Sequence, residues 1–271
     1  MRIQLKFKAL TVPFILSYNY QPHVQAFIYK AIAHAEQKYA AKLHDLGYWH
    51  PRDGKRYKLF VFSDLLLGKR QPVKDGLKVY NAHITLLISS AMPLFLEALV
   101  NGVFHSHHIT LGKNHFIMDQ FETLPEPAFR SEMQFTCLSP LTLSTQIQEN
   151  GRLKLHYIRP QETRSFERVM HENLANKYRR IHGKEPPDGP FRFDFDKRYI
   201  DRKKGRISRL TYIHKDTPQE TAIKGFMAPF TVQAHPDLIK VGYEAGFGGR
   251  NSLGFGMVDI VRGKIDHETH E

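Results

Sequence analysis

Residues 241–260, VGYEAGFGGRNSLGFGMVDI, concentrate six of the 18 glycines that the whole chain contains. The apolar spacing over residues 235–246, just before most of these glycines, predicts a short helix. The alternation over residues 254–261 predicts a closing strand. A helix, a glycine-rich loop and a strand are therefore expected to follow one another at the end of the sequence.

Two nucleotide-binding interpretations of this loop are excluded by its sequence. A P-loop requires G-x-x-x-x-G-K-[ST], but Gly248 and Gly249 precede Arg250, Asn251 and Ser252. A dinucleotide site needs glycines between a strand and a following helix, which is the reverse of the order predicted here. Two interpretations remain: a tight helix-to-strand junction, or a loop whose bare backbone lies against a phosphodiester chain. The nucleic-acid contacts predicted by the second are Gly246, Gly248, Gly249, Arg250, Asn251, Ser252 and Gly254.

The charge balance favours the nucleic-acid interpretation. The chain has 39 Lys and Arg against 27 Asp and Glu, a formal net charge of +12, and such an excess attracts polyanions. Residues 197–209, KRYIDRKKGRISR, form a strongly basic run, and residues 177–184, KYRRIHGK, form a second one. The alternative for each run is a solvated charged loop. The predicted contacts in the first run are Lys197, Arg198, Arg202, Lys203, Lys204 and Arg206.

The order of predicted elements occurs twice along the chain. Before residue 124 it is strand, helix, strand, strand, helix, strand, with the middle strands at 57–67 and 77–89. After the proline-punctuated segment 124–129 the same order returns, with a helix that Ser165 is expected to cap and Gly183 to end. This repetition predicts an α+β protein of two tandem ferredoxin-like (RRM-like, βαββαβ) domains, residues 1–125 and 126–271.

The remaining composition points to a cytoplasmic protein. A single cysteine, Cys137, excludes an internal disulfide and a cysteine-based zinc site, which favours a reducing compartment. The opening residues MRIQLKFKAL lack the continuous apolar segment of a secretory signal, and no stretch has the length of a membrane helix. We expect no membrane association, no cofactor and no metal.

The glycines of the last segment also carry a family resemblance. The pattern G-x-G-x-x-x-S-x-G-x-G, formed by Gly246, Gly248, Ser252, Gly254 and Gly256, resembles the C-terminal motif of the CRISPR-associated repeat-processing endoribonucleases of the RAMP superfamily. Residues 18–32, 42–47 and 57–65 resemble the first helix of that family and the segment after it. The resemblance implies metal-independent cleavage of the repeat in CRISPR precursor RNA by 2′-hydroxyl attack. The products would have 2′,3′-cyclic phosphate and 5′-hydroxyl ends and would be mature guide RNAs.

The same resemblance implies a catalytic set of Tyr29, His44 and Lys58. These residue types suit the reaction, because histidine can act as acid or base near neutral pH, while lysine and tyrosine can stabilise the phosphorane or position the phosphate. Ten residues separate Gly47 from Lys58, a longer connection than the family pattern. His50 and Lys55 are therefore rival candidates for the acid-base and cationic roles.

Other functions are compatible with parts of the sequence. A RAMP-type subunit that binds CRISPR RNA within an effector complex would share the folds and the loop without the catalytic set. The pairs His83/Thr85 and His108/Thr110 match the H-x-T signature of two-histidine phosphoesterases. His44-Asp45 mimics a metal-dependent HD phosphohydrolase, a class that is all helical. The expected partners are the repeat RNA, as precursor and as product, and effector-complex subunits, and the protein is expected to be a monomer or a homodimer.

Overall fold

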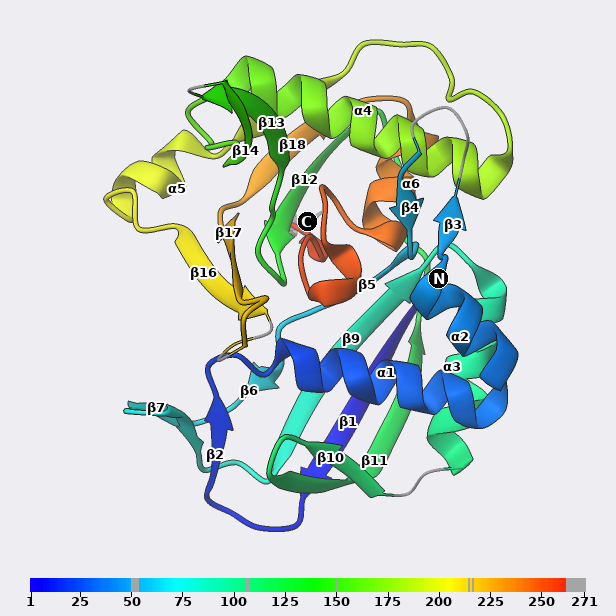
Figure 1. The fold of residues 1–271 in the computed structure, drawn as a ribbon, viewed down its shortest axis with the longest axis vertical. Helices are drawn as coiled ribbons and strands as arrows, with labels where there is room; N and C mark the ends of the chain where they lie inside the picture. The colour runs from blue at the N-terminus through cyan, green and yellow to red at the C-terminus, as the bar shows by residue number, and fades with distance from the viewer. Residues whose placement is uncertain (50–53, 106–107, 150, 214, 216, 262–271) are drawn as a thin grey trace, which may run out of the picture.

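The fold consists of two lobes, each built around one antiparallel sheet (Figure 1). This computed structural model describes residues 1–49, 54–105, 108–149, 151–213, 215 and 217–261. The lobes follow one another in sequence, and the last segment of the chain returns to lie between them (Figure 1).

The first lobe contains a six-stranded sheet in the order β10-β11-β1-β9-β5, with β6 also paired to β9. Its strands are β1 (Arg2–Ala9), β5 (Phe60–Phe62), β6 (Leu66–Leu67), β9 (His83–Ser90), β10 (His108–Leu111) and β11 (Asn114–Leu124). Its helices are α1 (Gln21–Ala35), α2 (Gln37–Asp45) and α3 (Pro93–His105). The smaller strands are β2 (Phe14–Ser17), β7 (Arg70–Val73) and β8 (Gly76–Val79), which form one sheet, and the hairpin of β3 (Tyr48–Trp49) and β4 (Arg56–Tyr57).

The second lobe contains a four-stranded sheet in the order β15-β18-β12-β19. Its strands are β12 (Glu132–Cys137), β15 (Arg192–Phe195), β18 (Phe230–Gln233) and β19 (Val258–Ile260). Its helices are α4 (Thr163–His182), α5 (Lys197–Arg202), α6 (Pro236–Ala245) and the 3-10 turn η1 (Asn251–Leu253). Two hairpins project from it, β13 (Ser144–Glu149) with β14 (Arg152–Tyr157) and β16 (Ser208–Ile213) with β17 (Thr221–Phe226).

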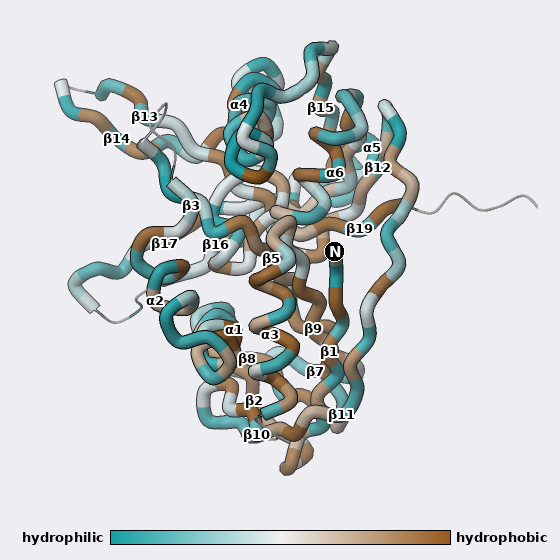
Figure 2. The backbone as a smooth tube through the Cα atoms, turned by 90° about the vertical axis from the view of Figure 1, so that its right-hand side faces the viewer, coloured by the Kyte–Doolittle hydropathy of each residue, from teal (hydrophilic) through white to brown (hydrophobic). Residues whose placement is uncertain are grey.

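Both sheets have the strand order of a ferredoxin-like domain. In each, the first strand lies between the fourth and the third, and the second strand lies outside the third. The predicted pair of ferredoxin-like folds is confirmed. Each sheet has its own apolar core, and Figure 2 shows hydrophobic segments along β1 and β9 in the interior of the first lobe.

Some local predictions are wrong. The segment 57–67 is divided among β4, β5 and β6. The segment 77–89 is divided between β8 and β9, because its first part pairs with β7, which lies in the turn-rich stretch. Ser165 does not cap α4, which begins two residues earlier after Glu162. The carboxylate of Glu162 accepts a hydrogen bond from the Arg159 backbone N–H, 2.8 Å away, and closes the turn before the helix. Gly183 ends α4 as predicted, with φ of 68°.

The two lobes meet at the glycine-rich segment. The turn η1 packs against β5 and α1 of the first lobe, and α6 packs against β5 and β9. Buried apolar residues from both lobes, Val61, Leu87 and Met257, form a separate small cluster at this contact. Of the helices in the described part of the chain, none has the length and apolarity needed to cross a membrane.

Candidate active site

The three residues of the predicted catalytic set lie together around the end of α2. Tyr29 projects from α1, and its ring lies 5.2 Å from the His44 ring in an edge-to-face arrangement. On its other side the Tyr29 ring contacts the buried Phe60 on β5, with ring centroids 5.9 Å apart. The Tyr29 ring therefore lies between the apolar core and an exposed histidine, and its contact with Phe60 fixes its position.

His44 has a neighbour that orients its ring. Its Nδ1 lies 2.8 Å from Oδ1 of Asp45, and both side chains are about 70% exposed. A carboxylate only accepts hydrogen bonds, so Nδ1 is assigned as the donor in this pair. The other ring nitrogen, Nε2, is then the acceptor, and the neutral imidazole can take a proton there.

Lys58 completes the group from the segment between β4 and β5. Its ammonium donates to the backbone carbonyls of Leu43 and His44 in the last turn of α2, where a cation is favoured by the helix dipole. An ammonium has three donors, so within the described part of the chain one N–H is left for a ligand. Burial lowers the pKa of Lys58, and the nearby Asp45 carboxylate partly opposes this shift. Burial raises the pKa of the Tyr29 phenol, which keeps that hydroxyl protonated at neutral pH.

A cleft of about 640 Å³ joins Lys58, the member of this group that lines it, to the glycine-rich loop. Lys58 lies on one wall, and Gly249, Arg250, Asn251 and Ser252 lie on another, although almost 200 residues separate them in sequence. The middle of α4 contributes Val169, Glu172, Asn173 and Asn176 to the lining. The structure therefore places one predicted catalytic residue and four predicted RNA contacts in one cleft.

Most of the predicted glycine contacts face protein. Gly246, Gly248 and Gly254 are buried, all with positive φ. A Cβ on Gly248 would lie 2.5 Å from the Thr142 carbonyl, and one on Gly254 would lie 2.6 Å from the Phe62 ring. Close packing within the second lobe at Gly248 and against the first lobe at Gly254 explains these glycines without RNA. RNA contact at the three positions remains a prediction.

A buried lysine holds the loop, and sequence patterns did not reveal it. Lys177 on α4 is 1% exposed, and its Nζ donates to the carbonyls of Gly246 at 2.5 Å and Gly248 at 2.8 Å. It also donates to Oδ1 of Asn251 at 2.8 Å. Burial lowers the pKa of Lys177, but only the charged ammonium supplies three donors for three acceptors. Lys177 lies in the basic run 177–184, which by its charge favours RNA binding; here it is a structural cation instead.

Arg180, in the same basic run, links the two lobes. Its guanidinium donates to the Tyr48 carbonyl at 3.3 Å and the Lys55 carbonyl at 3.0 Å, and it lies 4.4 Å from the Tyr57 ring centroid. These contacts fasten the β3–β4 hairpin to α4. In the sequence, Arg180 is marked only by its place in a basic run. Such a run does not distinguish an exposed cation from one that binds the protein itself.

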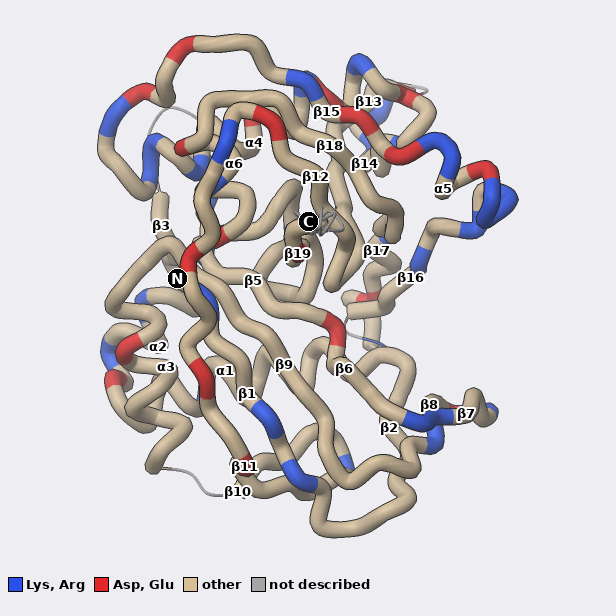
Figure 3. Tube along the Cα trace, turned by 180° about the vertical axis from the view of Figure 1, so that it is seen from behind, with Lys and Arg blue, Asp and Glu red and all other residues tan. Residues whose placement is uncertain are grey.

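The other basic run, 197–206, is exposed and lies at the far side of the second lobe. Figure 3 shows Lys and Arg gathered at α5 and the turn after it. Part of the run is helical, because Asp196 caps the short helix α5 by accepting a hydrogen bond from the Tyr199 N–H at 2.9 Å. The six predicted contacts, all exposed, are Lys197, Arg198, Arg202, Lys203, Lys204 and Arg206.

The rival sites have less support. His83 and Thr85 lie on β9, while His108 and Thr110 lie on β10, and β11 and β1 separate these strands. Three strand spacings amount to roughly 14 Å, which is too far for two histidines to share one phosphate. Lys55 is exposed and lines the same cleft as Lys58, and His50 lies outside the described residues. No group of three potential metal ligands occurs within the residues that the structure describes.

Comparison with known families is consistent with this geometry. The family model "CRISPR-associated protein Cas6, N-terminal" matches residues 15–122, and "CRISPR associated protein Cas6, C-terminal" matches residues 124–260.

The chain belongs to the Cas6 family.

Its similarity to other Cas6 proteins extends over almost the whole chain. The "CRISPR-associated endoribonuclease Cas6" of Pyrococcus furiosus is 31% identical over 98% of this chain and 90% of the relative. The "CRISPR-associated endoribonuclease Cas6 1" of Methanocaldococcus jannaschii is 29% identical over 97% of this chain and 94% of the relative. A solved "CRISPR associated protein Cas6" is 29% identical, covers 97% of this chain and 99% of its own, and superposes with a TM-score of 0.74.

Proposed function

We propose that this Cas6 protein is a metal-independent endoribonuclease that cleaves the repeat of CRISPR precursor RNA within the cleft between its two lobes. The observation that carries the proposal is the cleft itself, which joins Lys58, beside His44 and Tyr29, to the glycine-rich loop. The basic charge of the chain and the relatives named endoribonucleases support an RNA substrate.

The reaction requires one proton to leave the 2′-hydroxyl and another to reach the 5′-oxygen. In this proposal Nε2 of His44 takes the 2′-hydroxyl proton, since Nδ1 is held by Asp45. The 2′-oxygen bonds to phosphorus and the bond from phosphorus to the 5′-oxygen breaks, which gives a 2′,3′-cyclic phosphate and a 5′-hydroxyl. The third N–H of Lys58 protonates the leaving oxygen, and a lowered pKa makes this ammonium a better acid. Tyr29, protonated, donates a hydrogen bond to a phosphate oxygen.

Cleavage of a cognate repeat RNA in EDTA tests the proposal. We expect His44→Ala to lower the single-turnover rate by roughly 10²- to 10⁴-fold and to leave RNA affinity unchanged. His34→Ala is the matched control, because His34 is also exposed and lies in the last turn of α1. Full activity of His44→Ala would contradict the catalytic assignment, and a strict need for a divalent cation would contradict the mechanism. RNA binding without cleavage would favour an RNA-binding effector subunit.

We further propose that the domains divide as 1–125 and 126–271. The membership of the sheets supports this division, since Leu124 ends the last described strand of the first sheet and Glu132 begins the first strand of the second.

A further inference from the structure

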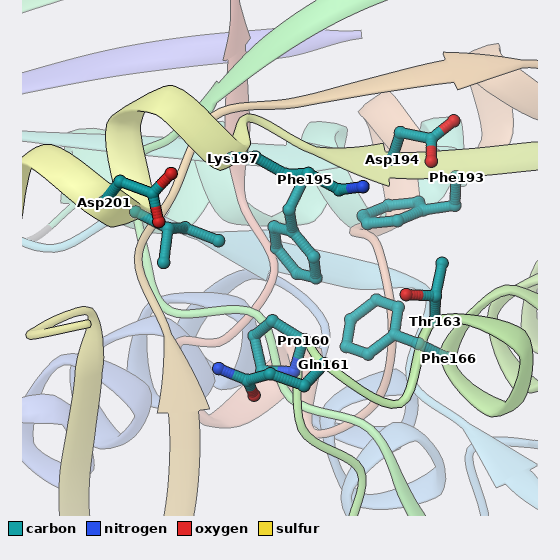
Figure 4. A pocket seen from close by; sticks show the side chains of 10 residues that line it. Pro160, Gln161, Thr163, Phe166, Phe193, Asp194, Phe195, Lys197 and Asp201 are labelled. Carbon is teal, nitrogen blue, oxygen red and sulfur yellow. The ribbon is translucent and has the colours of Figure 1, made fainter. Parts of the chain in front are cut away.

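A second pocket, of about 410 Å³, lies in the second lobe between α4, β15 and α5 (Figure 4). Its floor is aromatic, because Phe166 and Phe193 are almost fully buried there. Phe195 is only half-buried, and its ring stands edge-on to Phe166, at 4.9 Å and 69°. Figure 4 shows this ring pointing across the pocket toward Pro160 and Gln161. The pocket therefore offers a ring face on which a flat group can stack.

Polar groups surround this aromatic surface. Asp194 and Asp201 supply carboxylates, Gln161 an amide, Thr163 a hydroxyl and Lys197 an ammonium, all on exposed residues. Outside the pocket, α5 and the turn after it carry the exposed basic run described above (Figure 3). The lining is thus aromatic, with two carboxylates against one ammonium, while the surface beside it is cationic.

This combination distinguishes between possible occupants. An acidic peptide would suit the outer cations but would place its carboxylates near Asp194 and Asp201, and a basic peptide would be repelled by α5. An unpaired nucleotide satisfies both parts, because its phosphate is anionic and its base is flat and neutral. A base with an amino group can donate hydrogen bonds to carboxylates, as cytosine does to Asp or Glu.

The pocket and the cleft are both lined by residues of α4. Thr163 and Phe166 of α4 line the pocket, and residues from Val169 to Asn176 line the cleft. The span from Thr163 to Asn176 is roughly 20 Å at 1.5 Å per residue. The β13–β14 hairpin also connects them, since Ser144 lines the cleft, pairs with Tyr157, and Pro160 follows three residues later in the pocket.

We propose that this α4–α5 pocket binds one unpaired, amino-bearing base of the same RNA that occupies the cleft, with the adjoining phosphates on the cations of α5. The inference rests on the proposed function, because it assumes that the cleft binds RNA. Stacking on Phe195 would then hold the RNA at a point distant from the cleaved bond.

Single-position 2-aminopurine substitution in a synthetic repeat RNA tests this pocket, because stacking on an aromatic ring quenches 2-aminopurine fluorescence. With His44→Ala protein, we expect quenching at one position, abolished in Phe195→Leu, together with an affinity loss of about tenfold. Phe195→Leu retains an apolar side chain against Phe166, and circular dichroism verifies its fold. Phe104→Ala, which removes an exposed ring on α3, is the control and should behave as the parent.

The possible outcomes separate this inference from the proposed function. If the wild type neither binds nor cleaves repeat RNA, the proposed function fails and the pocket inference fails with it. If it cleaves RNA while Phe195→Leu keeps both the quenching and the affinity, only the pocket inference is overturned, and a protein occupant takes its place. Quenching abolished in Phe195→Leu but kept in Phe104→Ala supports the inference.

Discussion

At the scale of single residues, the three catalytic candidates have very different surroundings, and these surroundings change the pKa of two of them. Tyr29 is held against Phe60, His44 is exposed beside Asp45, and Lys58 is bound to the end of α2. These surroundings move the pKa of Tyr29 up and that of Lys58 down. As pH rises, Lys58 therefore loses its proton before Tyr29, whereas free tyrosine loses its proton before free lysine.

This difference predicts the alkaline limb of the pH profile. As pH rises, Lys58 loses its proton below the ordinary lysine value, whereas Tyr29 stays protonated beyond the ordinary tyrosine value. We expect the single-turnover rate to fall at a pH below the ordinary lysine range, and Tyr29→Phe to keep this limb at a rate up to about 100-fold lower. Lys58→Arg should lose the limb, since arginine stays charged. Rates are corrected for uncatalysed RNA hydrolysis, and a limb that persists in Lys58→Arg would contradict the assignment.

Lys177 allows a second prediction about single residues. In Lys177→Met the carbonyls of Gly246 and Gly248 lose their buried donor, so the loop wall of the cleft shifts while Tyr29, His44 and Lys58 stay in place. We expect the RNA concentration at half-maximal rate to rise about tenfold, with the rate at saturation within about twofold of wild type. Arg168→Met, at an exposed position on the same helix, should change neither. A merely unfolded fraction would reduce the amplitude of cleavage and leave the half-maximal concentration unchanged.

At the scale of elements, the glycine-rich loop is a packed junction as much as a surface. Gly256 has φ of 84°, and a Cβ there would lie 2.0 Å from the Phe247 carbonyl. We expect Gly256→Ala to lower the free energy of unfolding by roughly 3 kcal/mol or more, measured by urea denaturation. Gly183→Ala is the matched control, because its φ of 68° is similar but nothing lies near its Cβ, and it should cost about 1 kcal/mol. Equal losses would show that backbone strain alone explains both glycines.

Some elements of the fold could be predicted from sequence patterns, and others could not. The two βαββαβ orders were predictable, because their helices α1, α3, α4 and α6 and most core strands bury one periodic apolar face. The hairpin of β13 and β14 was not, since its strands are mostly exposed and lack a buried face. Tyr29, His44 and Lys58 came from a family pattern. The contact of α1 with α2 brings Tyr29 beside His44, and the hydrogen bonds of Lys58 to the end of α2 place it next to them. Lys177 and Arg180 could not be assigned, because their acceptors are backbone carbonyls far away in sequence.

At the scale of the whole molecule, the two lobes divide the work that the proposed reaction requires. The first lobe carries the acid-base groups, and the second carries the loop, the exposed basic run and the aromatic pocket. Interactions such as the ion pair of Asp64 with Arg209 fix the lobes relative to each other. An RNA that bridges both lobes would touch cations well away from the cleaved bond, so its affinity should depend on salt through residues that do not affect chemistry.

That dependence can be measured by neutralising Lys203 and Lys204, which are exposed in the turn after α5. Removing one cation that neutralises a phosphate lowers the slope of log affinity against log salt by about 0.7 for single-stranded RNA. We therefore expect Lys203→Gln/Lys204→Gln to reduce the magnitude of this slope by roughly 0.7 to 1.4 in a filter-binding titration. The cleavage rate at saturating protein should be unchanged. Lys8→Gln/Lys113→Gln removes the same charge from exposed positions of the first lobe and should leave the slope as in wild type. If both double variants shift the slope equally, net charge rather than a defined phosphate path governs binding, and the basic run has no special role.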